Sequence, residues 1–253
     1  MATLIALGGA ELGEISPQGK LSAVSSDPIH REILAKTKKK HPKILYIPTA
    51  VDDSGDEIAV FRQYYLGLGA SEVEVLRLLG KENPSQASIR RKILEADAVY
   101  VNGGNTFHML QVWKRYGVDT LLKKAYQQGI VMSGYSAGSI CWFSYGCSDS
   151  FYKHRPFRLK AMNWHPALIC PHYDSQAFRR PALKKIIKRT PGLVGIGLDE
   201  DAAIEIVDPR YRILTSAPEA KVRRTYWKQG KYFIEELENS KEFKDLNTLL
   251  TKP

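Results

Sequence analysis

Short apolar runs alternate along the chain with longer segments in which apolar residues recur at helical spacing. The runs indicate strands, and several are continuously apolar, as expected for central strands covered on both faces. The predicted strands are residues 3–7, 43–47, 72–76, 98–101, 130–132, 168–169, 194–198 and 203–206. The predicted helices are residues 29–37, 58–66, 88–95, 106–115, 118–127 and 175–190.

This alternation predicts an α/β fold, in which right-handed crossovers join the strands of a mostly parallel sheet. Residues 221–237 differ, because they predict two strands around the turn Lys228-Gln229-Gly230-Lys231, which is typical of an antiparallel edge hairpin. No repeat, linker or low-complexity stretch divides the chain. We therefore expect residues 1–253 to form one domain.

Composition places the chain among globular proteins, with 43% hydrophobic and 25% charged residues. No apolar run reaches the roughly 18 residues of a membrane span, and the apolar start of the chain predicts a first strand rather than a signal peptide. The chain has only three cysteines, an odd number, and none of them form a CxxC motif; they are Cys141, Cys147 and Cys170. This pattern indicates a reducing compartment, so we expect a cytoplasmic protein with no disulfide and no zinc site.

The net charge is +10, which raises the question of nucleic-acid binding. The basic residues are mostly dispersed, and the densest runs, 36–40 and 179–189, are typical of helix ends or solvated helix faces. No nucleic-acid-reading motif accompanies them. We expect no nucleic-acid partner and no membrane partner, and interpret the charge as favouring solubility or acidic substrates.

One predicted strand runs into Asn102-Gly103-Gly104-Asn105-Thr106-Phe107 and then a helix. Paired glycines leave backbone N–H groups unshielded, and N–H groups at a helix start suit an oxyanion or carboxylate. The alternative is an ordinary strand-to-helix turn that needs glycine and an N-cap.

A second strand meets a helix through Gly134-Tyr135-Ser136-Ala137-Gly138, a Gly-x-Ser-x-Gly pattern. In this context the pattern predicts a nucleophile elbow, a sharp turn that points Ser136 outward. The N–H of Ala137 and the helix dipole would then face the developing negative charge. The alternative is a glycine-rich turn without catalytic function.

A nucleophilic serine needs a base. His172 follows the apolar strand end Leu168-Ile169-Cys170-Pro171, at the same rim of the sheet as Ser136, and is the predicted base. His30, His41 and His108 are poorly placed on or after helices, whereas His154 and His165 flank a segment that we expect to be irregular and exposed.

The base in turn needs a carboxylate that orients it. Asp149 lies between the serine and the histidine, and Glu200 lies at another strand end. Glu200 has the better location, since its strand would neighbour the one that delivers His172. Both residues remain candidates.

Asn-Gly-Gly-Asn-Thr-Phe, Gly-Tyr-Ser-Ala-Gly-Ser, Pro-His-Tyr-Asp and Gly-Ile-Gly-Leu-Asp-Glu resemble, in this order, the motifs of the peptidase E and cyanophycinase family. The N-terminal Ile-Ala-Leu-Gly-Gly and the later Ile-Pro-Thr-Ala also resemble that family. The resemblance spans nearly the whole chain. It implies a three-layer α/β/α fold of the flavodoxin-like or class I glutamine amidotransferase-like type, and a serine triad without metal or cofactor.

Within that resemblance, Ser136 matches the family's serine and His172 its histidine. Peptidase E relatives point to Asp149 as the acid, and the cyanophycinase branch points to Glu200. The resemblance implies that Arg179 or Arg180 would bind a substrate carboxylate. The full set of oxyanion and substrate-binding positions that it implies is Gly103, Gly104, Asn105, Thr106, Ala137, Arg179 and Arg180.

The resemblance implies a serine peptidase that hydrolyses short peptides, in particular dipeptides with N-terminal Asp, as a monomer or homodimer. The alternatives are a hydrolase of another amide or of an isoaspartyl or cyanophycin-like peptide, and a non-peptidase binding protein on the same fold. A lipase-like hydrolase would usually place its histidine near the C-terminus, and a glutamine amidotransferase would need Cys at position 136.

Overall fold

The computed structural model describes residues 1–10, 12–80 and 84–253, and its strands form two mixed sheets. In the larger sheet the strand order is β14-β11-β10-β1-β5-β4-β2-β3. Strands β1, β5, β4, β2 and β3 are parallel, whereas β10, β11 and β14 are antiparallel additions at one edge. The bounds are β1 (Thr3–Leu7), β2 (Lys43–Ile47), β3 (Glu72–Val75), β4 (Ala98–Val101), β5 (Val131–Tyr135), β10 (Ala202–Val207), β11 (Arg210–Thr215) and β14 (Lys244–Asp245).

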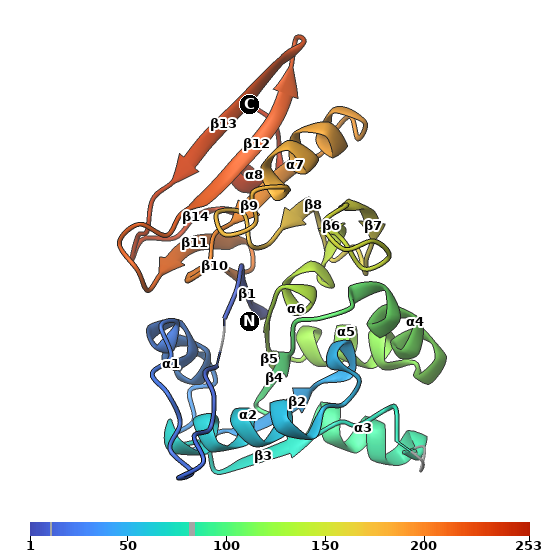
Figure 1. Ribbon diagram of the computed structural model, residues 1–253, viewed down its shortest axis with the longest axis vertical. Helices are drawn as coiled ribbons and strands as arrows, with labels where there is room; N and C mark the ends of the chain where they lie inside the picture. Colours follow the sequence, from blue (N-terminus) through green and yellow to red (C-terminus); the bar gives the residue numbers. More distant parts are fainter. Residues whose placement is uncertain (11, 81–83) are drawn as a thin grey trace.

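The second sheet has the strand order β13-β12-β9-β8-β6-β7. Its centre, β9, β8 and β6, is parallel, and antiparallel strands flank it on both sides. Strands β12 and β13 form a long hairpin that extends beyond the rest of the molecule (Figure 1). The bounds are β6 (Phe143–Ser148), β7 (Phe157–Lys160), β8 (His165–Cys170), β9 (Val194–Leu198), β12 (Val222–Lys228) and β13 (Lys231–Leu237).

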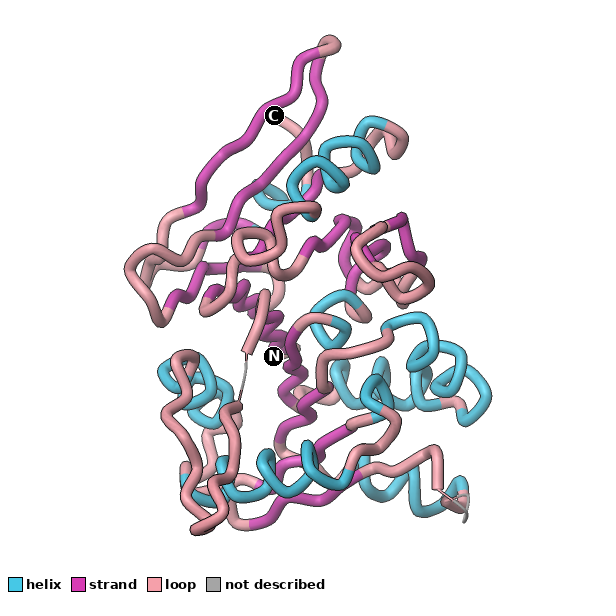
Figure 2. The backbone as a smooth tube through the Cα atoms, viewed as in Figure 1, coloured by secondary structure: helices cyan, strands magenta, loops and turns pink. Residues whose placement is uncertain are grey.

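Most of the helices surround the larger sheet, whereas α7 packs on the second sheet (Figure 2). The short helix α8 contacts β11 and β14 of the larger sheet as well as β8 of the second sheet. The helices are α1 (Asp27–Lys36), α2 (Gly55–Gly67), α3 (Gln86–Leu94), α4 (Thr106–Tyr116), α5 (Val118–Gln127), α6 (Ala137–Ile140), α7 (Arg179–Lys188) and α8 (Leu246–Leu250), with a short 3-10 turn at Thr49–Val51. Among the described residues, no helix is both long enough and apolar enough to cross a bilayer.

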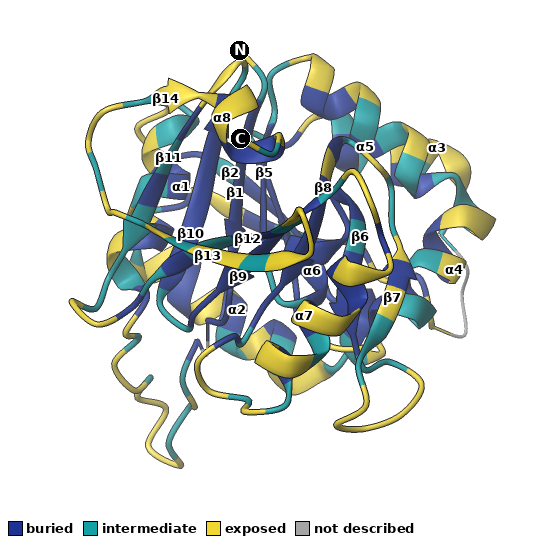
Figure 3. Cartoon of the chain, turned by 90° about the horizontal axis from the view of Figure 1, so that it is seen from above, coloured by how far each residue is buried: buried dark blue, intermediate teal, exposed yellow. Residues whose placement is uncertain are grey.

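Alternate residues of each central strand pack on opposite faces of the larger sheet, as the two-residue period of a strand requires. Ile5 and Tyr46 pack with α1 and α2, whereas Leu4 and Leu45 pack with α3, α4 and α5. Ile196 of the second sheet packs in the same core as Leu4 and Leu45. The opposite face of the second sheet is covered by α7. The central strands are therefore buried on both faces, whereas the edge strand β13 of the hairpin is exposed or half-buried throughout (Figure 3).

The predicted α/β class with helices on both sides of the strands is confirmed, but the strands are divided between two sheets and each sheet is mixed. Strands β6, β7, β11 and β14 were not expected from the sequence. Strand β7 occupies residues 157–160 of the segment between His154 and His165 that we expected to be irregular, and His165 itself begins β8 and is buried rather than exposed. The chain path brings the carboxyl ends of β1, β4, β5 and β8 towards α6, where the candidate site lies.

Candidate active site

Ser136 lies between the end of β5 and the start of α6, in a backbone conformation that is rare for a side-chain-bearing residue. Its φ is 52° and its ψ is −110°. The backbone N–H of Ser136 donates to the Leu7 carbonyl at 3.3 Å, which ties the turn to β1. A serine held in this conformation between a strand and a helix has the geometry of a nucleophile elbow.

The two glycines of the Gly-x-Ser-x-Gly pattern are required by the neighbouring strand. A Cβ atom at Gly134 would lie 2.4 Å from the Val101 carbonyl oxygen, and one at Gly138 would lie 2.1 Å from the same oxygen. Gly134 also has a positive φ of 156°. Any larger residue would push β4 away from the elbow, so the pattern allows β4 and α6 to approach each other closely.

The loop after β4 lies directly beside the elbow. A Cβ atom at Gly103 would lie 3.2 Å from the Ser136 Cβ and 2.6 Å from the Tyr135 ring, so only glycine fits there. Gly104 has a positive φ of 124° and packs on the Ala50 carbonyl. Within the described residues, the N–H groups of Gly104 and Ala137 donate to no protein acceptor, which leaves both available to an oxyanion.

The next two residues of this loop have structural contacts. Asn105 is the N-cap of α4: its side-chain oxygen accepts from the His108 N–H at 3.0 Å, and its amide donates to the Ser150 carbonyl at 3.4 Å. Thr106 begins α4 and is buried. The Asn105 side chain therefore holds the loop in place, and the backbone of Gly104, which is exposed whereas Gly103 is buried, is the part of this motif that is open to a ligand.

His172 and Glu200 form a close pair. His172 Nδ1 and Glu200 Oε1 are 2.5 Å apart, and because a carboxylate only accepts, Nδ1 carries the proton and Nε2 is left as the acceptor. Ser175 Oγ donates to the same Oε1 at 2.8 Å, and the Glu200 N–H donates to Asp174 Oδ1 at 2.9 Å. Burial disfavours the charged carboxylate, but the contacts with His172 and Ser175 hold the pKa of Glu200 below its usual value.

The extension of β1 connects this pair to the serine. Leu7 accepts from Ser136, and two residues later Gly9 forms a parallel bridge with Glu200. A Cβ atom at Gly9 would overlap the Glu200 carboxylate, at 1.4 Å from Oε2. The Gly8-Gly9 pair thus lets the two sheets meet at the site. No hydrogen bond joins Ser136 Oγ directly to His172 among the described residues.

Asp149, the other candidate acid, is engaged elsewhere. Its Oδ1 accepts from Arg179 Nη2 at 2.9 Å, and among the described residues no hydrogen bond or ion pair joins it to His172. Arg179 is 4% exposed, and its other nitrogens donate to the Cys147 carbonyl and to Gln176. Asp149 and Arg179 thus form an ion pair with each other. This conflicts with our expectations that Asp149 could orient the histidine and that Arg179 could bind a substrate carboxylate.

Arg180 is the exposed arginine of the pair. Its Nε donates to the Tyr173 carbonyl at 3.1 Å, and its guanidinium lies 5.5 Å from the centre of the Tyr173 ring. Since Tyr173 directly follows His172, this cation is held next to the histidine loop with donors to spare.

A cavity of about 970 Å³ adjoins the elbow at Tyr135. It is lined by Tyr135, which precedes the serine, and by the first turns of α2 and the loop after β1. Its lining includes the carboxylates of Glu14, Asp56 and Glu57 and, among the described residues, no basic side chain. This part of the site therefore favours a cationic group.

Sequence reasoning did not assign a role to Gly9, Asp174 or Ser175. The sequence contained an indication for each residue. Gly8-Gly9 follows a predicted strand in the same way as Gly103-Gly104 does, and Asp174 and Ser175 lie two and three residues after the predicted base His172. Their contacts with Glu200 depend on the meeting of two sheets, which the local pattern does not specify.

Comparisons with known proteins agree with this fold. The model of peptidase family S51 matches residues 17–214. The chain is 34% identical over 193 residues to the uncharacterized peptidase YgaJ of Bacillus subtilis strain 168, covering 76% of this chain and 81% of that protein. It is 31% identical over 146 residues to peptidase E of Shewanella denitrificans, covering 57% of this chain and 59% of that protein.

The fold is also similar to that of a solved structure. A crystal structure of a peptidase from an acI-B1 Actinobacterium superposes with a TM-score of 0.72 at 19% identity, covering 97% of each chain. The family match and the relatives named as peptidases identify a serine-type peptidase. With the family match over most of its length, the chain belongs to peptidase family S51.

Proposed function

We propose that this peptidase cleaves dipeptides with an N-terminal Asp, with Ser136 as nucleophile, His172 as base and Glu200 as the orienting acid. The observation that carries the proposal is the 2.5 Å contact between His172 Nδ1 and Glu200 Oε1. It holds the imidazole in the tautomer whose Nε2 can accept a proton from a serine hydroxyl. Binding of substrate would close the remaining gap to Ser136, as hydrogen bonds of this type often shorten in the bound enzyme.

The reaction then has four stages. His172 removes the proton of Ser136, which attacks the scissile carbonyl carbon. The N–H groups of Gly104 and Ala137 stabilise the oxyanion, and each such donor typically lowers the barrier by about 3 kcal/mol. His172 next protonates the leaving amine, and water finally hydrolyses the acyl-enzyme with His172 again as base.

Two charged regions support an aspartyl substrate with a free amino terminus. The acidic cavity beside Tyr135, with Glu14, Asp56 and Glu57, suits the α-ammonium group. Arg180, held against Tyr173, is the cation that supports binding of the aspartyl carboxylate. A substrate that carries both charges would contact both regions at once, which would place its scissile bond near Ser136.

A second candidate substrate class follows from the same cavity. Its volume of about 970 Å³ exceeds the needs of a single ammonium group, and its three carboxylates would suit a guanidinium or lysine side chain. An isoaspartyl or cyanophycin-like peptide that carries a basic residue is therefore the alternative.

A dipeptide panel distinguishes these substrates. Wild-type enzyme is incubated with Asp-Leu, Leu-Asp, Ala-Leu, N-acetyl-Asp-Leu, Asp-Arg and β-Asp-Arg, and free amino acids are measured by liquid chromatography. We expect cleavage of Asp-Leu and none of N-acetyl-Asp-Leu or Ala-Leu. Preferential cleavage of β-Asp-Arg would favour the alternative, and cleavage of Ala-Leu as fast as Asp-Leu would refute aspartyl specificity.

A further inference from the structure

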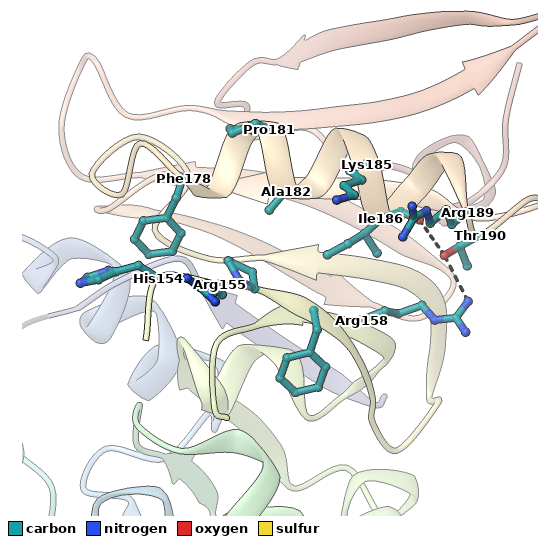
Figure 4. A pocket seen from close by; sticks show the side chains of 12 residues that line it. His154, Arg155, Arg158, Phe178, Pro181, Ala182, Lys185, Ile186, Arg189 and Thr190 are labelled. Atoms are coloured by element: carbon teal, nitrogen blue, oxygen red, sulfur yellow. Dashed lines mark hydrogen bonds between the residues drawn. The ribbon is translucent and has the colours of Figure 1, made fainter. Parts of the chain in front are cut away.

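A second cavity lies away from the elbow, between α7 and the segment that leads into β7. Its volume is about 670 Å³, a size typical of ligand sites. In Figure 4, Phe178 and His154 lie at one end, Arg158, Arg189 and Thr190 lie at the other, and α7 forms one wall between them. We call this cavity the α7 groove; its lining residues are His154, Arg155, Pro156, Phe157, Arg158, Phe178, Pro181, Ala182, Lys185, Ile186, Arg189 and Thr190.

The α7 groove is strongly and uniformly basic. Arg155, Arg158, Lys185 and Arg189 line it without any acidic residue. Throughout the described chain, none of these four cations has a carboxylate oxygen within 4.0 Å. Arg158 is held in place by donating to Thr190 Oγ1 at 3.2 Å and by lying 4.9 Å from the Tyr145 ring centre. Unpaired positive charges around a concave surface concentrate anions there.

The arrangement contrasts with the arginine that precedes it on the same helix. Arg179 is buried and neutralised by Asp149, as expected of a structural cation. The cations of the α7 groove are exposed at its rim, and retain their donors for a ligand. Charge that serves only solubility has no reason to surround a cavity.

Between the cations the lining is apolar. Pro156, Phe157, Phe178, Pro181 and Ile186 contribute to it from both walls. The aromatic rings are fixed by neighbours, since Phe157 stacks on Phe151 at 4.8 Å and Phe178 meets His154 edge-on at 5.0 Å. A ligand that fills the α7 groove must therefore present apolar groups as well as negative charges.

We propose that the α7 groove binds an acidic peptide segment in which carboxylates alternate with apolar side chains. Basic groups at both ends would pair with the carboxylates, and the proline and phenylalanine lining would cover the apolar side chains. A nucleic acid fits less well, because its phosphates are continuous and its strands have no aliphatic groups to fill the apolar floor. The site is distinct from the proposed Ser136 centre and does not depend on the proposed function.

The test is isothermal titration calorimetry of the full chain with the peptide acetyl-Asp-Leu-Glu-Phe-Glu-amide. Its blocked amino terminus keeps it from binding as an aminopeptidase substrate, and the Ser136→Ala variant should bind it as tightly as wild type. The double variant Lys185→Gln/Arg189→Gln should bind roughly tenfold or more weakly, because two charge-assisted contacts are lost.

A matched control removes the same charge from the same helix. Lys184 and Lys188 lie over the Trp227 ring, outside the α7 groove, so the double variant Lys184→Gln/Lys188→Gln should bind within about twofold of wild type. An equal loss in both double variants would mean that only the general field of the protein attracts the peptide, and would overturn the proposal.

Two further ligands test the chemistry. The equally charged peptide acetyl-Asp-Ser-Glu-Ser-Glu-amide should bind at least about fivefold more weakly, because it lacks the apolar groups that the lining covers. Equal binding of the two peptides, tighter binding of a single-stranded oligonucleotide, or no binding of the first peptide to wild type at millimolar concentration would each refute an acidic-peptide site.

Discussion

At the scale of single residues, the sequence offered two candidate carboxylates, Glu200 and Asp149, and two candidate arginines, Arg179 and Arg180, and their partners divide them by role. Glu200 contacts His172, whereas Asp149 and Arg179 contact each other. The difference matters because an acid that orients a histidine acts on the reaction, while an acid that neutralises a buried arginine acts on folding.

The first prediction compares Glu200→Gln with Asp149→Asn. Glu200→Gln should lower kcat by roughly 10²–10⁴-fold with little change in stability, because the histidine loses its orienting charge. Asp149→Asn should keep kcat within about tenfold but destabilise the fold by roughly 3 kcal/mol, since Arg179 is left buried without its counter-charge. Steady-state kinetics and urea unfolding measure the two effects, and a reversed pattern would assign the orienting role to Asp149.

The second prediction concerns Arg180. Arg180→Gln should raise KM for Asp-Leu by roughly tenfold or more while changing kcat much less, because a charge-assisted contact with the aspartyl side chain is lost. Lys184→Gln, which removes a charge one turn further along α7 over Trp227, is the control and should leave KM unchanged. An unchanged KM in Arg180→Gln would mean that another group binds the carboxylate.

The sequence identified Ser136 and His172 as candidates because each follows an apolar strand at the same rim. It left Glu200 and Asp149 open. That choice depends on where Arg179 lies relative to Asp149, a contact across 30 positions of sequence that local pattern does not specify.

At the scale of elements, the elbow depends on the close approach of α6 to β4. Both glycines of the pattern pack on one carbonyl, that of Val101. The glycine-rich loop after β4 and the serine turn after β5 are thereby held side by side, since β4 and β5 are neighbouring parallel strands. This is the element-level reason why oxyanion donors from one strand end can serve a nucleophile at another.

The third prediction tests this packing with Gly138→Ala. The added methyl group would lie 2.1 Å from the Val101 carbonyl oxygen, so the variant should lose about 1–3 kcal/mol of stability and most of its activity. Gly67→Ala is the matched control, because nothing lies within 4 Å of a Cβ there and alanine is the better helix former. Thermal unfolding should show a lower Tm for the first variant only; equal Tm values would show that the elbow can relax.

The predicted central strands lie close to the observed ones because continuous apolar runs mark strands buried on both faces. Strand β7 was not predicted because it is only four residues long and two of them are exposed basic residues, Arg158 and Lys160. The division into two sheets depends on which strand ends pair across long sequence distances, and no local pattern encodes that.

At the scale of the whole molecule, buried histidines link folding to pH. His30 lies fully buried in α1, where its ring nitrogens contact Tyr65 and Ser26. Burial, opposed by the charge of Asp27, lowers the pKa of His30 to about 3. Burial likewise lowers the pKa of His165 to about 4. Both must remain neutral in the folded state.

The fourth prediction follows from the sign of these shifts. Below pH 6.5 the unfolded chain binds protons that the folded chain does not, so stability falls as pH decreases from about 6.5 towards 3. His30 alone should account for roughly 2 kcal/mol between pH 7 and pH 5. His30→Gln should reduce this loss, whereas His41→Gln, at an exposed position, should not. Urea unfolding at both pH values checks this, and an undiminished pH dependence in His30→Gln would contradict it.

The charges that sum to +10 are unevenly distributed over the folded molecule. The cavity next to the serine is acidic, whereas the α7 groove is basic, so the two cavities should attract ligands of opposite charge. Composition alone predicted only a basic surface, because the separation of charge between cavities arises from folding.

The central claim is that Ser136 performs the chemistry, and kcat/KM for Asp-Leu in wild type and Ser136→Ala tests it most directly. The variant is folded if its circular dichroism and Tm match those of wild type. We predict that it loses roughly 10⁴-fold or more of kcat/KM, because no other group can form the acyl-enzyme. A folded variant that retains activity within about tenfold of wild type would contradict the assignment of Ser136 as the nucleophile.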